Sequence, residues 1–326
     1  DSFLSRNSQC LANDIVLIDG FSSSGKSLVA AIFGYLNRSE QWQLKEVYER
    51  IAVLNYIGEI SDNSTSVILK IQSDNHLYNL MIGRNVNFRN TDISSPYNDG
   101  LYERYLSRTK KGEGDQITKE AKKVKPILPL HVHYIFGYSD ILLRGFNDRL
   151  KLYIVILRNP FTLIKAWHQG NWVNRICKVD REFTLCCRYE GNPIPWFAIE
   201  YADEYINSSD LEKAILTVYQ LYTRIISMYN SLSDLRKKKM MIIFFEKFII
   251  NPELYIDKIC DILETQRNDD FDKIMTKLSL PRKSEDANSV SLNDFIESYK
   301  KELSDKFIGI LKELDDKYLS FQHKIS

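Results

Sequence analysis

Residues 20–27 have the residue types and the spacing of a loop that binds phosphate groups. Their sequence, GFSSSGKS, satisfies the pattern G-x-x-x-x-G-K-S/T in full. Small residues let backbone N–H groups converge on phosphate oxygens, and a helix that starts at the loop adds partial positive charge. Lysine supplies a full cation, and the last serine supplies a hydroxyl for a phosphate or a metal ion. We therefore predict that a phosphate-bearing ligand is bound by Ser22, Ser23, Ser24, Gly25, Lys26 and Ser27.

The elements around this loop predict an α/β fold. The β-branched run at residues 15–18 is typical of a buried parallel strand, and residues 28–36 favour a helix. A second buried strand is expected at residues 152–157, where Arg158-Asn159-Pro160 ends it, and a third at residues 240–245. Strands that alternate with helices indicate a three-layer fold of the P-loop type, with a mainly parallel central sheet flanked by helices.

We expect residues 1–326 to form a single domain with an excursion at 55–125 and a flap-like segment at 170–210. In the excursion, residues 67–71 and 77–82 could pair as a hairpin, and residues 110–125 favour a solvated loop or an exposed helix. Further helices are expected at the positions 211–232, 252–263 and 292–321.

Composition excludes several classes of protein. The formal net charge is only +1, so we expect no nucleic-acid partner held through its phosphates. The longest apolar runs fall far short of the ~20 residues that span a bilayer. The cysteines are odd in number and lack CxxC spacing, which favours thiols in a reducing compartment and, with no secretory segment visible, a cytoplasmic location. These cysteines are Cys10, Cys177, Cys186, Cys187 and Cys260.

A phosphate loop alone leaves the reaction open. A nucleoside-triphosphate enzyme normally has an apolar strand that ends in a carboxylate and helps to hold magnesium. Here the strand at 152–157 ends in Arg158, and only the strand at 240–245 is followed by a carboxylate, Glu246. One alternative is therefore a P-loop kinase with Mg²⁺ on Ser27 and Glu246. Another is a nucleotide-binding or structural protein without activity.

Four segments, in order along the chain, resemble the sulfotransferase family that uses 3′-phosphoadenosine 5′-phosphosulfate (PAPS). Residues 15–28 resemble its first strand and 5′-phosphosulfate loop, and residues 153–160 (YIVILRNP) resemble its second strand followed by R-D/N-P. Residues 243–248 (IFFEKF), with Asn251-Pro252 after them, resemble its Y-E-D-L segment and the helix that follows. Arg282-Lys283 resembles the start of its R-K-G phosphate clamp.

The resemblance implies a transferase that moves a sulfuryl group from PAPS to a hydroxyl acceptor and requires no metal ion. It implies that residues 22–27 bind the 5′-phosphosulfate, and that Arg158, Arg282 and Lys283 bind the 3′-phosphate. Lys26 would stabilise the charge that develops during transfer.

Four positions depart from the family pattern, and two of them, Ser23 and Ala166, keep the inactive alternative open. Aligned on Gly25, the family's catalytic lysine falls at Ser23, while Lys26 stands where a threonine is common. Ala166 stands where the family often has a serine, and Ser284 replaces the glycine of R-K-G.

Sulfuryl transfer needs a base that takes the proton of the attacking hydroxyl, and a histidine near neutrality can serve. His131 and His133 precede the second core strand, in a segment similar to the family's T-H-x-P, and their spacing on an extended chain points both rings to one face. Either is a candidate catalytic base. The pair could also ligate a metal or stand as polar residues at a strand edge.

Residues 83–96 are rich in side-chain donors, which suits a hydroxyl-rich or anionic acceptor. Arg84, Asn87 and Arg89 are the candidate substrate-binding residues, for a carbohydrate or another small alcohol or phenol. The alternative is a solvated turn region, since Asn, Asp and Ser also favour turns.

Overall fold

A parallel sheet lies at the centre of the computed structural model, which describes residues 4–6, 9–97, 100–287 and 289–325. Within these residues, the sheet has five strands in the order β2-β3-β1-β4-β7. Their bounds are β1 Asp14–Gly20, β2 Gln43–Leu44, β3 Ile127–His131, β4 Leu150–Leu157 and β7 Met240–Phe244. The strands are almost entirely buried, as their continuous apolar runs predict.

Strand β1 lies at the middle of the sheet and pairs with β3 on one side and β4 on the other. In register, Ile18 lies opposite His131 on β3 and opposite Ile154 on β4. Because all five strands are parallel, their carboxyl ends meet at one edge of the sheet, where open α/β sheets bind ligands. The loop after β1 therefore lies beside the residues that follow β3 and β4.

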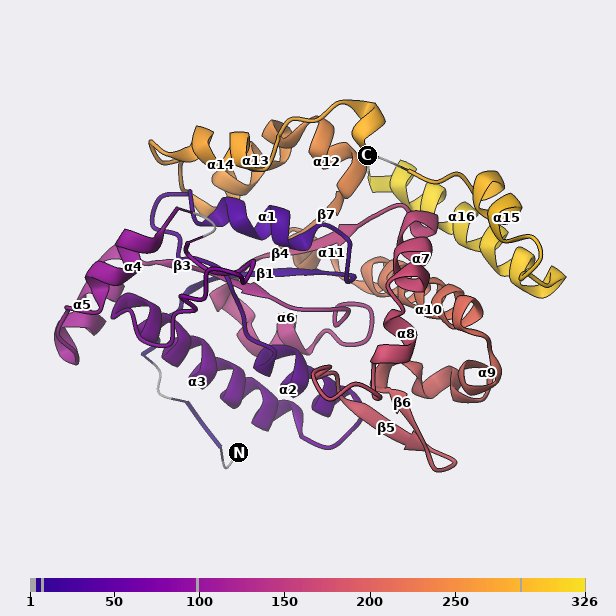
Figure 1. The fold of residues 1–326 in the computed structure, drawn as a ribbon. Helices are drawn as coiled ribbons and strands as arrows, with labels where there is room; N and C mark the ends of the chain where they lie inside the picture. Colours follow the sequence, from indigo (N-terminus) through magenta and orange to yellow (C-terminus); the bar gives the residue numbers. More distant parts are fainter. Residues whose placement is uncertain (1–3, 7–8, 98–99, 288, 326) are drawn as a thin grey trace.

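Helices cover both faces of the sheet and give the three layers that the sequence predicts (Figure 1). Figure 1 shows α1 (Lys26–Phe33), α13 (Pro252–Leu263) and α14 (Phe271–Lys277) on one face. On the other face lie α2 (Val47–Tyr56), α3 (Asp62–Met81) and α6 (Ile141–Phe146). The other helices are α4 Tyr102–Arg108, α5 Asp115–Val124, α7 Pro160–Gln169, α8 Trp172–Arg175, α9 Ala202–Asn207, α10 Asp210–Ser231, α11 Asp234–Lys237, α12 Phe245–Ile250, α15 Leu292–Tyr299 and α16 Asp305–Ile325. None of the helices in the described ranges is both long enough and apolar enough to cross a membrane.

The predicted hairpin across residues 67–82 is wrong, because this segment belongs to the 20-residue helix α3. Ser61 caps the helix by accepting a hydrogen bond from the Ser64 backbone N–H, and α3 packs against α6. Two short apolar runs can be strands or parts of one helix, and periodicity alone does not separate these possibilities. The predicted helix at 292–321 is in fact two helices, α15 and α16.

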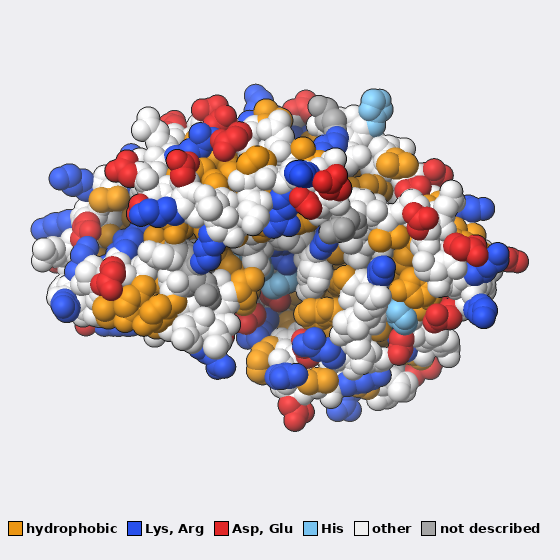
Figure 2. All heavy atoms as spheres, turned by 45° about the horizontal axis from the view of Figure 1, so that its top comes forward, with side chains coloured by type: hydrophobic (Ala, Val, Ile, Leu, Met, Phe, Trp, Pro, Cys, Tyr) orange, Lys and Arg blue, Asp and Glu red, His pale blue; other side chains and the backbone are white. Residues whose placement is uncertain are grey.

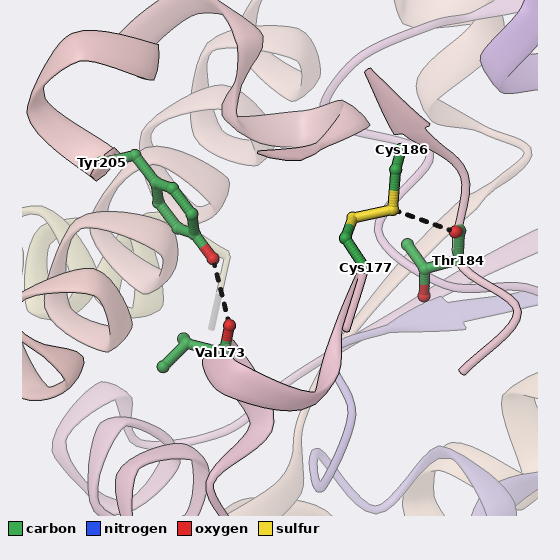
Figure 3. Close-up of a disulfide and its surroundings, with 5 residues drawn as sticks. All are labelled: Val173, Cys177, Thr184, Cys186 and Tyr205. Carbon is green, nitrogen blue, oxygen red and sulfur yellow. Dashed lines mark hydrogen bonds between the residues drawn. A yellow bond between two sulfur atoms is a disulfide. The ribbon is translucent and has the colours of Figure 1, made fainter. Parts of the chain in front are cut away.

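A small two-stranded sheet lies in the segment 170–210, with β5 (Cys186–Tyr189) antiparallel to β6 (Asn192–Pro195). A disulfide joins Cys177 to Cys186 and ties this hairpin to the turn after α8 (Figure 3). The prediction of thiols is therefore wrong for this pair, because the turn brings the two Cα atoms to 5.9 Å. The other three cysteines are free thiols.

Candidate active site

The loop after β1 has the tight backbone that the phosphate-loop pattern predicts. Gly25 has a φ of +91°, and a Cβ at this position would lie 2.2 Å from the Phe245 ring. Only glycine therefore fits there. Ser23 also adopts a positive φ, of 69°, at the exposed tip of the loop. Gly25 N-caps α1, so the loop leads directly into the helix N-terminus.

Lys26 is buried at the base of this loop, where its Nζ donates a hydrogen bond to the backbone oxygen of Phe21 at 2.9 Å. Burial lowers the pKa of the Lys26 ammonium to about 8, although the nearby carboxylates of Asp19 and Glu49 oppose that shift. An ammonium has three N–H donors, so two of them can still be given to an anion. A buried cation of this kind is suited to binding a phosphate or sulfate oxygen.

Aromatic side chains hold the loop in place from outside. Trp167 donates from Nε1 to the backbone oxygen of Ser22 at 3.0 Å, and the Ser22 and Tyr134 hydroxyls lie 2.6 Å apart. The Ser24 hydroxyl is fully buried and has no hydrogen-bond partner. Buried polar atoms usually have a partner, so this orphan hydroxyl indicates a place for a ligand atom.

Arg158 lies at the carboxyl end of β4, and its Nη1 donates to the backbone oxygen of Ser23 at 2.7 Å. Its guanidinium stacks over the Phe245 ring at 4.9 Å, and its Nε is buried without a partner. Burial lowers the pKa of Arg158, and the like charge of Arg282 adds to that shift. The carboxylate of Glu246 opposes this shift and has a larger effect on Arg158 than Arg282 has.

The two residues predicted to clamp a 3′-phosphate differ in their surroundings. Arg282 is half-buried, and its guanidinium donates to the backbone oxygens of Leu278 and Ser279. Lys283 is exposed, and its Nζ lies 3.9 Å from a carboxylate oxygen of Glu285. Both line an open hollow on the surface that follows α14. Neither Arg158 nor the loop of residues 20–27 lines this hollow, although the charge of Arg282 has a small effect on the pKa of Arg158.

Two carboxylates near the loop are already engaged by protein groups. Asp19 accepts hydrogen bonds from the backbone N–H groups of Gly20 and Phe136 and from the Tyr153 hydroxyl. Glu246 accepts from the Asn159 backbone N–H at 2.7 Å, and burial raises its pKa. Glu246 therefore positions the turn after Arg158, and this engagement weakens its predicted role as a magnesium ligand.

The structure brings His131 to the loop, as the final residue of β3. Its side chain is buried, and neither ring nitrogen has a hydrogen-bond partner. Burial lowers its pKa well below the ordinary value, and the positive charge of Lys26 contributes to that shift. A neutral imidazole with unpartnered nitrogens can donate a hydrogen bond from one nitrogen and accept one at the other.

His133 lies beside His131, with ring centroids 5.0 Å apart, so the prediction that both rings share one side is confirmed. Glu49, from the first turn of α2, accepts hydrogen bonds from both the backbone N–H and the Nδ1 of His133, at 3.0 and 2.9 Å. With Nδ1 as donor, Nε2 is left as the acceptor. The sequence did not point to Glu49, which is 84 residues from His133.

Figure 2 shows a hollow near the middle of one face of the molecule, with a histidine at its floor and side chains of both charges around it.

The three predicted substrate residues are engaged within or near their own segment. Arg84 pairs with Glu113 at 2.7 Å, and Arg89 contacts Thr91 and Asp92. Asn87 donates to the Asp92 carboxylate at 3.1 Å. These contacts match the alternative of a turn region held by its own polar side chains.

No protein-family model matches the chain, and no curated protein sequence matches it. Among solved structures, a sulfotransferase domain from the curacin biosynthetic pathway is similar over 94% of this chain and 99% of that chain, with 11% identity and a TM-score of 0.38. A sulfotransferase domain from the Synechococcus PCC 7002 olefin synthase is similar over 96% of this chain and 98% of that chain, with 9% identity and a TM-score of 0.38. The sulfotransferase STF9 from Mycobacterium avium is similar over 90% of this chain and 76% of that chain, with 9% identity and a TM-score of 0.40. With identities this low, none of the three assigns an activity or a residue role to this chain.

Proposed function

We propose that this chain is a sulfotransferase that moves a sulfuryl group from PAPS to a hydroxyl acceptor. One observation carries the proposal: a cation, Arg158, joins the phosphate loop at the strand end where a triphosphate enzyme normally has a magnesium-holding carboxylate. A second arginine, Arg282, lies close enough to lower the pKa of Arg158. A ligand with two separate anionic groups matches a phosphate loop next to a pair of arginines.

The residues present fit such a cofactor. Buried polar atoms without partners occur at Ser24 Oγ, Arg158 Nε and both nitrogens of His131. Residues 22–27 would hold the 5′-phosphosulfate, and Arg158 with Arg282 would hold the 3′-phosphate. When bound, PAPS would supply the sulfuryl group and a good leaving group. Lys283 is exposed and paired, so we assign it at most an outer contact.

We assign the other steps of the transfer to side chains of this protein. Lys26 is placed to stabilise negative charge at the loop, because its ammonium is preorganised and shielded from water. His133 is the better placed base, because Glu49 holds its Nδ1 and leaves Nε2 to take the acceptor proton. Glu49 is then a positioning residue. The charges of Lys26 and His133 both act on His131, which would bind the acceptor oxygen or the sulfuryl group.

A thermal-shift titration tests the proposal by comparing 3′-phosphoadenosine 5′-phosphate with ATP and Mg²⁺. We expect stabilisation by the first ligand and little by the second. The Lys26→Ala variant is the control for binding at the loop. Stabilisation by ATP and Mg²⁺ alone would favour the kinase, and stabilisation by neither would favour a protein without nucleotide chemistry.

A further inference from the structure

A second pocket lies between the end of β2, the first turn of α2 and the middle of α3. It is a cavity of ≈ 140 Å³, large enough for several waters or one small ring. Its polar lining consists of Lys45, Gln72, Asn75, His76, Asn79 and Asn85. Asn75 and Asn85 are exposed at its rim, whereas His76 and Asn79 are buried. Nothing in the sulfuryl-transfer machinery described above uses these side chains.

The floor of this pocket has an unsatisfied polar group. The His76 side chain is buried, its Nδ1 lies 3.3 Å from the Tyr48 hydroxyl, and its Nε2 has no hydrogen-bond partner. If Tyr48 donates to Nδ1, Nε2 carries a proton and is a donor without a partner. In the other tautomer Nε2 is an acceptor without a partner. A hydroxyl group matches either case, because it both donates and accepts. Burial lowers the pKa of His76 to about 3, so the ring is neutral and does not attract anions.

The other polar side chains that line the pocket are also mostly uncharged. Amide side chains predominate, and Asn79 donates to the Asn75 carbonyl oxygen at 3.2 Å, which orients both groups. Among the described residues that line the pocket, Lys45 is the single cation and no carboxylate is present. Neutral amides at several angles are suited to a ring with several hydroxyls, while a phosphate or sulfate group would need more positive charge.

Two elements connect this pocket to the candidate base. Lys45 directly follows β2, whose last residue, Leu44, lies opposite His131 in the sheet. Tyr48 and Glu49 are successive residues of α2: Tyr48 contacts His76 in the pocket, and Glu49 contacts His133. Among the described residues, His131, His133 and Glu49 do not line the pocket itself.

We infer that this pocket binds a neutral, polyhydroxylated ring of sugar type. This inference does not rest on the proposed function. Asn85 belongs to the segment 83–96 that the sequence indicated for acceptor binding, but Arg84, Asn87 and Arg89 do not line this pocket.

Saturation-transfer NMR tests the inference, with methyl glucoside, methyl galactoside and N-acetylglucosamine as probes. We expect transfer to at least one of them and a dissociation constant that rises at least about tenfold in the double variant Asn75→Ala/Asn85→Ala. Both residues are exposed, so this variant should fold. Asn63→Ala, an exposed change on the same helix and outside the pocket, is the matched control and should bind as the unmodified chain does.

The result separates this inference from the proposed function. Binding of 3′-phosphoadenosine 5′-phosphate without binding of any sugar would overturn the pocket assignment and leave the sulfotransferase proposal standing. Sugar binding without nucleotide binding would support the pocket assignment and overturn the sulfotransferase proposal. Equal sugar affinity in the double variant and the control, or binding only of sugar phosphates, would also overturn the inference.

Discussion

The guanidinium of Arg158 donates a hydrogen bond from Nη1 to the backbone oxygen of Ser23, at 2.7 Å. This contact joins the end of β4 to the tip of the phosphate loop, 135 residues earlier in the chain. The same side chain stacks on Phe245, the residue that directly follows β7. Three neighbouring strand ends therefore position one cation at the loop.

Replacing Arg158 by alanine should weaken the binding of 3′-phosphoadenosine 5′-phosphate by about 1.5–3 kcal/mol, the range for hydrogen bonds to charged groups. Adenosine 5′-phosphosulfate lacks the 3′-phosphate, so its affinity should change much less. Isothermal titration calorimetry of both ligands measures the difference. Equal losses would mean that Arg158 acts only by holding Ser23 in place.

The Lys26→Ala variant should lose about 10²-fold or more in turnover, which is the scale of losing one preorganised group that stabilises developing charge. The measurement is transfer of sulfate from labelled PAPS to an acceptor. Lys273→Ala, an exposed lysine on α14, is the control and should keep normal turnover. Normal turnover in Lys26→Ala would exclude Lys26 from the mechanism.

The buried Lys26 ammonium should also destabilise the folded chain. Its pKa is lowered from 10.5 to about 8 in the folded chain, so between these values the unfolded chain binds more protons and stability rises with pH. Below about pH 8 the folded chain carries the full cost of a buried charge. Lys26→Met should therefore be more stable at pH 7, by up to about 3 kcal/mol, and should lack the rise between pH 8 and 10. Urea denaturation at both pH values measures this, and a less stable Lys26→Met would contradict it.

A histidine base predicts that kcat/KM falls as the pH drops through the range in which imidazole gains a proton. His133→Ala should flatten this acid limb, and Glu49→Gln should lower kcat while leaving KM for PAPS unchanged. His168→Ala, on α7, is the control and should keep the limb. If the limb persists in both the His131→Ala and His133→Ala variants, the base is a different group.

The disulfide between Cys177 and Cys186 should stabilise the hairpin of β5 and β6 (Figure 3). The two cysteines are 9 residues apart in sequence. Losing a loop closure of this length costs about 2–3 kcal/mol in the chain-entropy model. Cys177→Ser should therefore lower Tm, and a reductant should lower the Tm of the unmodified chain but not of the variant. Cys260→Ser is the control, since Cys260 is a free thiol.

Local patterns predicted the parts of this protein that depend on neighbours in sequence. The strand, loop and helix around Lys26 occur where the sequence indicated, and α13 begins and ends at the predicted residues. Buried parallel strands have continuous apolar runs, and a proline marks the first turn of α7 and of α13. By contrast, the apolar runs of α3 are short enough to suit either a strand or a helix, and its packing on α6 favoured the helix.

The sequence by itself predicted the strand, loop and helix around residues 20–27, the parallel α/β sheet and the two histidines that share one face before β4. Only the tertiary structure decided what surrounds them. Glu49 reaches His133 across 84 residues, Arg158 reaches Ser23 across 135, and His76 faces a pocket that three separate elements enclose. Hydrogen bonds and burial depend on distances in space, whereas sequence patterns report only the periodicity and turn preferences of nearby residues. The partners of the site residues therefore follow from the packing of helices on the sheet.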